Sequence, residues 1–351
     1  MRTVKEFTNF KKYYSEMSEN LRPFIKEKIE ESISKQEIQD YNFSRKMFIT
    51  FFSLSFVPLV LLFLTFLIIS KNPTGAIVYF VIMLLLGIGL GITTYVFYRK
   101  YSKIRENFRT RLSAFLQENG TGIYDQCFKW LDNEIEYLGN IKDTSGHSYS
   151  PSMKEIRTFR SAKVPYDAYW YENCYSGLLK LRKKHLILFS VDTFRNERKD
   201  SKGNITYNYF TSGLIKIQVN NEITTQFPFE LLNTGKRFFK KVKLENNEFV
   251  KTFKPGTDNE LAIRQMYTPL SMELSLELLK TVNTKISNFG ICSNGSSIFI
   301  SFPIDPGFMR FDVPVFKSIE KATKELFNDI LYDTFSFYYL IAFMLIPTYI
   351  E

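Results

Sequence analysis

Two long apolar runs near the amino end constrain the fold more than any other feature of this chain. They cover residues 47–70 and 76–98, and neither contains an acidic residue, a lysine, an arginine or a histidine. Each run exceeds the roughly 20 residues that a helix needs to cross about 30 Å of hydrocarbon. Because backbone groups in lipid must be satisfied internally, we expect both runs to cross as helices. The sequence therefore predicts a two-helix transmembrane hairpin.

Basic residues flank the outer ends of this hairpin. They are Arg45, Lys46, Arg99, Lys100, Lys103, Arg105, Arg109 and Arg111. The connecting turn, residues 71–75, contains one base, Lys71. Positive charge marks the cytoplasmic side of membrane helices, so this asymmetry predicts that both termini are cytoplasmic. We expect a multi-pass protein of the cell inner (cytoplasmic) membrane.

Two glycines in the second run have the spacing of a helix-packing motif. Gly87 and Gly91 form a GxxxG, which allows another helix to approach closely, and the first run of the same chain is the expected partner. The alternative is that glycine is simply common in membrane helices. Neither run contains an ionisable group of the kind that marks ion or proton paths, which argues against a transporter or a channel.

The charge balance has a membrane explanation and a nucleic-acid explanation. The net charge is +10 and the isoelectric point is about 9.2, while a mean hydropathy of −0.14 indicates that most of the chain lies outside the bilayer. Positive charge beside a membrane segment typically sets orientation and contacts anionic lipid, so nucleic acid is disfavoured as a partner. The candidate headgroup contacts are Arg45, Lys46, Arg99, Lys100, Lys103 and Arg105.

The rest of the chain divides into four parts by pattern. We predict a cytoplasmic helical segment at 1–46, cytoplasmic helices at 99–138, a linker at 139–165 and a cytoplasmic α+β domain with a mainly antiparallel sheet at 166–351. Helical periodicity breaks at Arg22-Pro23 and again at 119–122, the sequence Asn-Gly-Thr-Gly. We expect the cytoplasmic helices to extend the hairpin.

The α+β domain has the short β-rich runs of a sheet. We predict strands at 169–174, 177–182, 185–191, 205–210, 213–219, 223–229, 289–292 and 297–302. Asn220-Asn221 and Asn294-Gly295 are the expected hairpin turns. Residues 192–203 are expected to form a charged loop, and the basic run 236–243 a lysine-protected edge strand, with a lipid or nucleic-acid contact as the alternative.

Two segments of the domain have a helical pattern. Residues 258–280 predict a helix with Asp258 as N-cap and Leu261 as the first buried position, and Pro269 breaks or restarts it. The apolar stripe expected after Pro269 is Leu270, Leu274 and Leu278. Residues 335–346 are nearly all apolar but too short for a typical span, so we expect a buried or interfacial helix, with a third span as the alternative.

No residue pattern specifies a reaction or a bound group. Cys127, Cys174 and Cys292 lie far apart and form no disulfide or zinc pattern. His185 has no second histidine or cysteine pair nearby, so a solvated turn or strand start is the expected role. No nucleophile with its base and no phosphate-binding loop is present. We therefore predict no catalytic residue, no cofactor, no metal site and no enzymatic activity.

Residues 242–302 carry a more specific pattern. It consists of Lys243-Leu244-Glu245, Glu248-Phe249 with Phe253, Asp258, Tyr267-Thr268-Pro269 and Ser297–Ser301, preceded by Phe210–Leu214. This pattern resembles a bacterial family of unknown function whose members pair an N-terminal transmembrane hairpin with a cytoplasmic α+β domain. The resemblance implies architecture and location, and it supplies no activity.

These observations favour a membrane-anchored interaction or scaffold module. The expected partners are the lipid bilayer and another membrane or cytoplasmic protein, and a homo-oligomer is left open. The alternative is a lipid- or envelope-handling factor that binds anionic lipid through the bases beside the hairpin.

Overall fold

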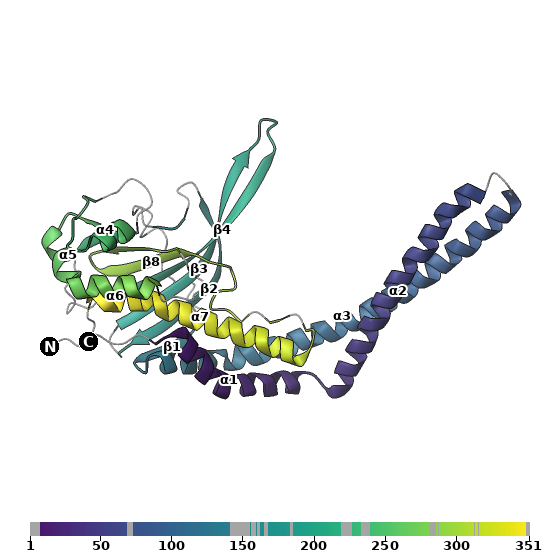
Figure 1. Cartoon of the computed structure of the whole chain (residues 1–351), viewed down its shortest axis with the longest axis horizontal. Helices are drawn as coiled ribbons and strands as arrows, with labels where there is room; N and C mark the ends of the chain where they lie inside the picture. The colour runs from purple at the N-terminus through teal and green to yellow at the C-terminus, as the bar shows by residue number, and fades with distance from the viewer. Residues whose placement is uncertain are drawn as a thin grey trace, which may run out of the picture. The chain divides into compact units, whose positions relative to one another are not determined.

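The computed structural model contains a helical region and an eight-stranded antiparallel sheet (Figure 1). It describes residues 8–68, 73–140, 155, 159, 162–164, 168–182, 185–218, 227–232, 239–280, 286, 288–311, 313–314 and 316–348. The chain divides into two compact units. Unit 1 comprises Met1–Arg22, Leu116–Asp312 and Leu326–Glu351, and unit 2 comprises Pro23–Phe115 and Val313–Glu325. The predicted combination of apolar helices with an α+β domain is therefore confirmed.

The described residues form seven helices and eight strands. The helices are α1 (Phe10–Ser32), α2 (Lys35–Ile68), α3 (Pro73–Leu131), α4 (Asn247–Phe253), α5 (Glu260–Met266), α6 (Pro269–Lys280) and α7 (Ile319–Thr348). The strands are β1 (Ile135–Gly139), β2 (Tyr169–Leu181), β3 (His185–Lys199), β4 (Ile205–Gln218), β5 (Pro228–Leu231), β6 (Gly256–Thr257), β7 (Gly290–Asn294) and β8 (Ser297–Pro303). Three helices, α2, α3 and α7, are long and apolar enough to cross a membrane.

The sheet of unit 1 has the strand order β1-β2-β3-β4-β8-β7-β5-β6. Every pairing is antiparallel, as the sequence predicts. The predicted Asn294-Gly295 turn joins β7 to β8, and Gly295 has a positive φ of 92° that suits glycine. The Asn220-Asn221 turn lies outside the described residues, as do most of the linker 139–165 and residues 236–238 of the basic run.

The predicted charged loop at 192–203 is wrong for most of its length. Strand β3 continues through Lys199, pairs with β4 from Ile205 onward, and leaves only residues 200–204 as the connection. Phe194 is buried and Arg195 is exposed, so charged residues occupy the outer face of a real strand. His185 starts β3, as expected, but it is buried rather than solvated.

The helix predicted to end at residue 138 ends at Leu131 instead, and residues 135–139 form β1. The expected interruption at 119–122 is also wrong, because α3 runs through it. Gly120 is buried, and a Cβ built there would collide with the ring of Phe311. This glycine therefore permits close packing of the Phe311 loop on a continuous helix.

Helix α7 lies at the centre of the core of unit 1. Its apolar window is 89% buried, so residues 335–346 form part of a buried helix. Phe337 contacts Phe189 of β3 at 5.0 Å between ring centroids, and Phe343 contacts Phe289 at 5.0 Å. On another side, Tyr13 of α1 lies against Phe335. Residues 335–346 are buried because the sheet and α1 cover their apolar side chains, as lipid would in a membrane span.

The helical stretch 258–280 divides into α5 and α6, and Pro269 restarts the helix as the first residue of α6. This is one of the two outcomes that the sequence predicts. Asn259 rather than Asp258 caps α5, accepting a hydrogen bond from the backbone N–H of Ala262. Leu261 is exposed, contrary to prediction. The expected leucine stripe of α6 is also wrong, because Leu270 is exposed. The buried positions are Ser271, Met272, Ser275 and Leu276.

Serines occupy the buried face of α6 because their hydroxyls are satisfied within the helix. Ser275 donates to the carbonyl of Ser271 at 2.8 Å, and Ser271 donates to the carbonyl of Thr268 at 2.9 Å. Helix α6 also contacts α4. A pattern that counts only apolar residues cannot identify such a face.

Unit 2 contains the second part of α1 from Pro23 onward, all of α2 and the greater part of α3. Pro23 lies inside α1, so the predicted break there is wrong; the chain turns at Ser34, which caps α2. The helix continues because Leu21, Ile25 and Ile29 keep one face buried on both sides of the proline. The segment 313–325 joins this unit through Phe316, whose carbonyl accepts from the Tyr41 hydroxyl at 2.7 Å.

Candidate membrane-contacting site

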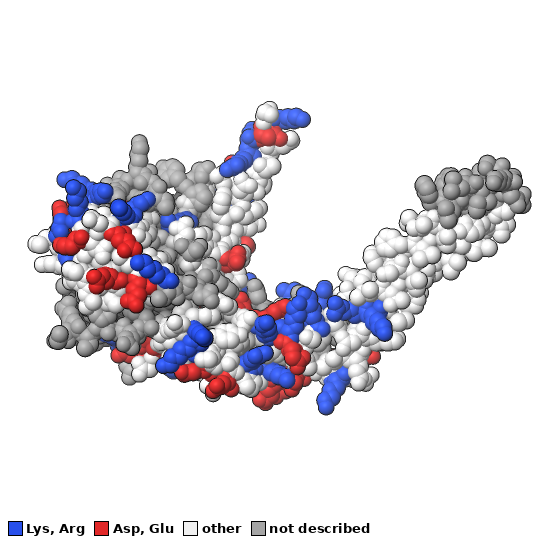
Figure 2. Space-filling view, viewed as in Figure 1, with Lys and Arg blue, Asp and Glu red and all other residues white. Residues whose placement is uncertain are grey.

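The apolar stretches of α2 and α3 expose their side chains. Only 6% of the apolar window of α2, and none of that of α3, is buried within the structure. Figure 2 shows the corresponding surface as a long stretch without Lys, Arg, Asp or Glu. Exposed apolar surface of this extent is unfavourable in water and favourable in lipid. This is the property of a membrane-embedded surface.

Helices α2 and α3 lie side by side along this stretch. Phe51 stacks on Phe97 with ring centroids 5.7 Å apart, and Phe48 contacts Tyr98 at 5.6 Å. Gly87 faces α2, since a Cβ built there would lie 3.9 Å from the Cβ of Pro58. Gly91 has no such neighbour within 4 Å. The two glycines of the GxxxG are therefore not equivalent, and only Gly87 contributes to the contact with α2.

Gly89 lies in a feature that the sequence analysis missed. An open groove of about 520 Å³ runs along one face of α3. Its lining residues are Ile82, Leu85, Leu86, Gly89, Leu90 and Thr93. They recur every three or four positions, so the groove is one apolar helix face with a glycine at its floor. The sequence offered one sign of this groove. Positions two residues apart lie on different faces of a helix, so Gly89 cannot share the face of Gly87.

The candidate headgroup contacts form a basic collar, defined here as Arg45, Lys46, Arg99, Lys100, Lys103 and Arg105. All except Arg105, which is half-buried, are exposed. Figure 2 shows lysine and arginine gathered where the uncharged stretch begins. Arg45 and Arg105 come from different helices and act on the same hydroxyl, that of Tyr41. Burial raises the pKa of Tyr41, and these two arginines partly oppose that rise.

Acidic partners occupy one end of this region. Lys100 lies 3.9 Å from Asp40, a separation at the limit of an ion pair, and both side chains are exposed. Arg111, outside the collar, donates to Glu37 at 2.7 Å. Hydrogen bonds from the backbone N–H of Ser34 and from Arg111 lower the pKa of Glu37. Exposed pairs of this kind are weak, and Lys100 is the collar base that such a pair involves in the described residues, so most of the collar charge is available.

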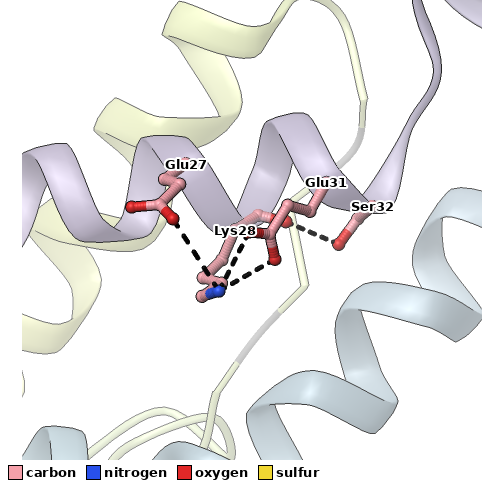
Figure 3. A network of polar contacts seen from close by, with 4 residues as sticks. All are labelled: Glu27, Lys28, Glu31 and Ser32. Carbon is pink, nitrogen blue, oxygen red and sulfur yellow. Dashed lines mark hydrogen bonds and ion pairs between the residues drawn. The ribbon is translucent and has the colours of Figure 1, made fainter.

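Helix α1 provides a contrast within the same unit. Lys28 lies 2.9 Å from Glu31 and 4.0 Å from Glu27, and Ser32 donates to the backbone carbonyl of Lys28 (Figure 3). These carboxylates raise the pKa of Lys28, with the Glu31 hydrogen bond as the largest cause. The positive charge of α1 is thus locally neutralised, whereas bases outnumber acids around the collar.

The described residues contain no cluster of three or more His, Cys, Asp or Glu side chains that could hold a metal ion. The three cysteines of the sequence are free thiols: Cys127 and Cys292 are buried, and Cys174 is half-buried. Burial raises the pKa of the Cys127 thiol to about 12. A scan against protein-family models, a search of curated proteins and a search of solved structures found no match for this chain.

Proposed function

We propose that the chain is a two-span inner-membrane protein whose α2–α3 hairpin anchors a cytoplasmic interaction module. The observation that carries this proposal is the pairing of two exposed apolar helices with a basic collar at one end, against the single base Lys71 in the sequence of the connecting turn. Lipid covers the apolar surface, and the collar lies at the cytoplasmic headgroups. Helix α7 stays in the core of unit 1 and does not cross.

The module binds a membrane or cytoplasmic protein through the sheet domain at residues 168–302 and catalyses no reaction. Exposed apolar side chains elsewhere on this domain support the role; they include Leu186 of β3, Leu261 of α5 and Leu270 of α6. A homo-oligomer is one form that such an assembly takes.

Topology is tested with two engineered cysteines, each in a Cys174→Ser background, and a membrane-impermeant maleimide. Gly75→Cys lies at the exposed start of α3, and Lys12→Cys lies on the exposed face of α1. We expect Gly75→Cys to react in intact spheroplasts and Lys12→Cys to react only after lysis. Labelling of Lys12→Cys from outside, with Gly75→Cys protected, contradicts the proposed orientation. Release of the protein by carbonate contradicts the anchor itself.

A second candidate function is favoured by the collar: the protein handles lipid or envelope components by binding anionic headgroups. Each base near an anionic surface contributes about fivefold to binding. We therefore expect Arg99→Glu with Lys103→Glu to reduce the phosphatidylglycerol that copurifies with the full chain. The matched control reverses Lys11 and Lys12, which are exposed on α1.

Cross-linking of intact membranes separates the two functions. A recurrent stoichiometric partner that survives reversal of the collar supports the interaction module. Loss of bound anionic lipid on collar reversal, without any such partner, supports lipid handling instead.

A further inference from the structure

The β3–β4 hairpin extends beyond the rest of its sheet (Figure 1). Strand β8 pairs with β4 only over Ser212–Gln218, and β2 leaves β3 at the pair Tyr169–Arg195. Beyond these points, residues 196–199 pair only with 205–208. We call residues 194–210, with the adjoining Tyr169–Tyr171 of β2, the arm. A two-stranded ribbon is only marginally stable alone, so we ask what its exposed surface contacts.

The two faces of the arm differ in chemistry. Phe194 and Phe210, which pair across the strands, point to a core cluster that includes Ala168 and Leu214. The opposite face carries large exposed side chains. They are Tyr169, Tyr171, Ile205, Tyr207 and Tyr209. Because strand side chains alternate, this aromatic face is a consequence of burying Phe194 and Phe210 on the other side.

Arg195 lies at the centre of the aromatic face. Its guanidinium lies 5.4 Å from the ring centroid of Tyr171 and 5.2 Å from that of Tyr207. Tyr171 in turn meets Tyr209 edge-to-face at 5.3 Å. The rings are thus held in place by one another and by the arginine. The guanidinium also covers the ring faces on which a nucleic-acid base would stack.

Trp170 pairs with Phe194 and therefore lies on the other side of β2 from the aromatic face, at a strand edge that β1 leaves open, and its side chain is 61% exposed. Its indole nitrogen donates to Asp192 at 3.2 Å. The buried carboxylate of Asp192 also accepts from Asn173 at 2.9 Å and from Ser190 at 2.7 Å. A buried network therefore fixes an indole ring that faces outward.

The tip of the arm presents positive charge. Four basic residues outnumber two acidic residues in 193–204. Of the two acids, Asp200 is engaged in the turn, where it accepts from the backbone of Lys202 and of Asn204 at 2.8 Å each. Glu197 is the acid that remains exposed on the strands. Arg198, Lys199 and Lys202 are exposed around it.

We propose that the arm docks on the anionic surface of a lipid bilayer. Tyrosine and tryptophan favour the boundary between hydrocarbon and water, and lysine and arginine are attracted to anionic headgroups. The aromatic face enters the interface together with the open edge of β2 that carries Trp170, and the bases of the tip contact the phosphates. The apolar helices keep a bilayer at high local concentration, which favours it over a partner in solution.

Trp170 reports this docking from the exposed edge of the arm, since the chain has two tryptophans and Trp130→Phe removes the other. The full chain carrying Trp130→Phe is reconstituted in phosphatidylcholine vesicles with or without phosphatidylglycerol, each made with bromine-labelled acyl chains. We expect a blue shift and quenching of Trp170 emission in the anionic vesicles, weakened by high salt. Unchanged emission in both vesicle types overturns the proposal.

Charge variants locate the effect. Reversal of Arg198, Lys199 and Lys202 to Glu is expected to weaken binding to the anionic surface by about fivefold or more per base. Quenching should therefore be abolished. Reversal of the exposed Lys11, Lys12 and Lys240 changes the net charge equally and is expected to leave quenching intact. Equal loss in both triple variants contradicts docking through the arm. If Trp130→Phe lowers the melting temperature, the emission of a polarity-sensitive fluorophore on Ile205→Cys, with Trp130 retained and Cys174→Ser, gives the same comparison.

Two further outcomes also overturn the proposal. Quenching of Trp170 by a single-stranded oligonucleotide in detergent assigns the arm to nucleic acid. Emission that depends on protein concentration in detergent, without lipid, assigns it to a second copy of the chain. The inference rests on the membrane anchor of the proposed function, and carbonate extraction tests that anchor separately. A carbonate-resistant protein with unquenched Trp170 therefore refutes the arm alone.

Discussion

The hydroxyls of Tyr13 and Thr334 lie 2.7 Å apart in the core of unit 1 and join α1 to α7 across 321 residues of sequence. Thr334 also donates within its own helix, to the carbonyl of Ile330 at 2.8 Å. Tyr13 is fully buried, and burial is the main reason that its pKa is raised well above that of a free tyrosine. The amino-terminal helix is therefore part of the folded core.

Removal of the Tyr13 hydroxyl is expected to have a small effect and removal of its ring a large one. Tyr13→Phe loses one buried hydrogen bond, at about 1 kcal/mol. Tyr13→Ala also leaves a cavity, at about 3–5 kcal/mol. Denaturant unfolding of the full chain in detergent measures both. Equal stability of Tyr13→Ala and wild type would show that α1 does not belong to the core.

Gly120 and Gly122 make a matched pair two positions apart in α3. Gly120→Ala is expected to destabilise the protein by about 1–3 kcal/mol, because the new methyl group meets the Phe311 ring. Gly122→Ala has open space and is expected to be neutral or stabilising by up to about 1 kcal/mol. Thermal unfolding compares them, and Phe311→Leu should partly rescue Gly120→Ala. The same effect at both positions would contradict this packing.

Gly87 and Gly91 provide a second matched pair, within the apolar part of α3. Gly87→Leu forces a side chain against Pro58 and is expected to weaken α2–α3 packing by about 1–3 kcal/mol. Gly91→Leu is expected to stay within about 0.5 kcal/mol of wild type. The measurement is unfolding of the full chain in nanodiscs. Greater sensitivity at Gly91 would indicate a contact with a different helix.

The thiols are expected to differ in reactivity. Burial raises the pKa of Cys127 to about 12, so near pH 7 it holds almost no reactive thiolate. Cys174 is half-buried, 3.1 Å from the Thr193 hydroxyl. Iodoacetamide should modify Cys174 first and Cys127 only on unfolding, as peptide mass spectrometry would show. Early modification of Cys127 in the native protein would contradict its burial.

Glu37 gives unit 2 a predictable pH dependence. Its pKa is lowered in the folded protein, so its contribution to stability is complete above its unfolded value and is lost as the pH falls from about 5 through the lowered folded value. Glu37→Gln keeps a side chain able to cap α2 but removes the charge. The stability difference between the two proteins should therefore shrink toward acid pH. A stability difference that stays constant with pH would show that Glu37→Gln acts through the shape of the side chain rather than through its charge.

The sequence predicted features that depend on local chemistry. The Asn294-Gly295 turn, the restart of a helix at Pro269 and the antiparallel sheet all follow from backbone preferences or alternation within a few residues. It failed where distant contacts decide the outcome. Residues 119–122 look like a helix break until Phe311 is brought against Gly120. The charged run after Val191 looks like a loop until β4 pairs with it.

The candidate site shows the same division. Composition alone identified the apolar runs and the collar, because charge and hydrophobicity act over whole segments. It could not distinguish Gly87 from Gly91, since that depends on which way α3 faces Pro58. The aromatic face of the arm was also hidden, because it exists only once strands β2, β3 and β4 align.

The order of the strands has a consequence for biosynthesis. Strands β1 to β4 are consecutive and can pair as they leave the ribosome, but the neighbour of β4 is β8, near the carboxyl end. At about 5–20 residues per second, several seconds pass before Ser297–Pro303 is made. During that interval the inner edge of a half-finished sheet is open to mispairing with another nascent chain. Slow translation between Gln218 and Ser297 should therefore increase aggregation, even though every residue of the finished protein is unchanged.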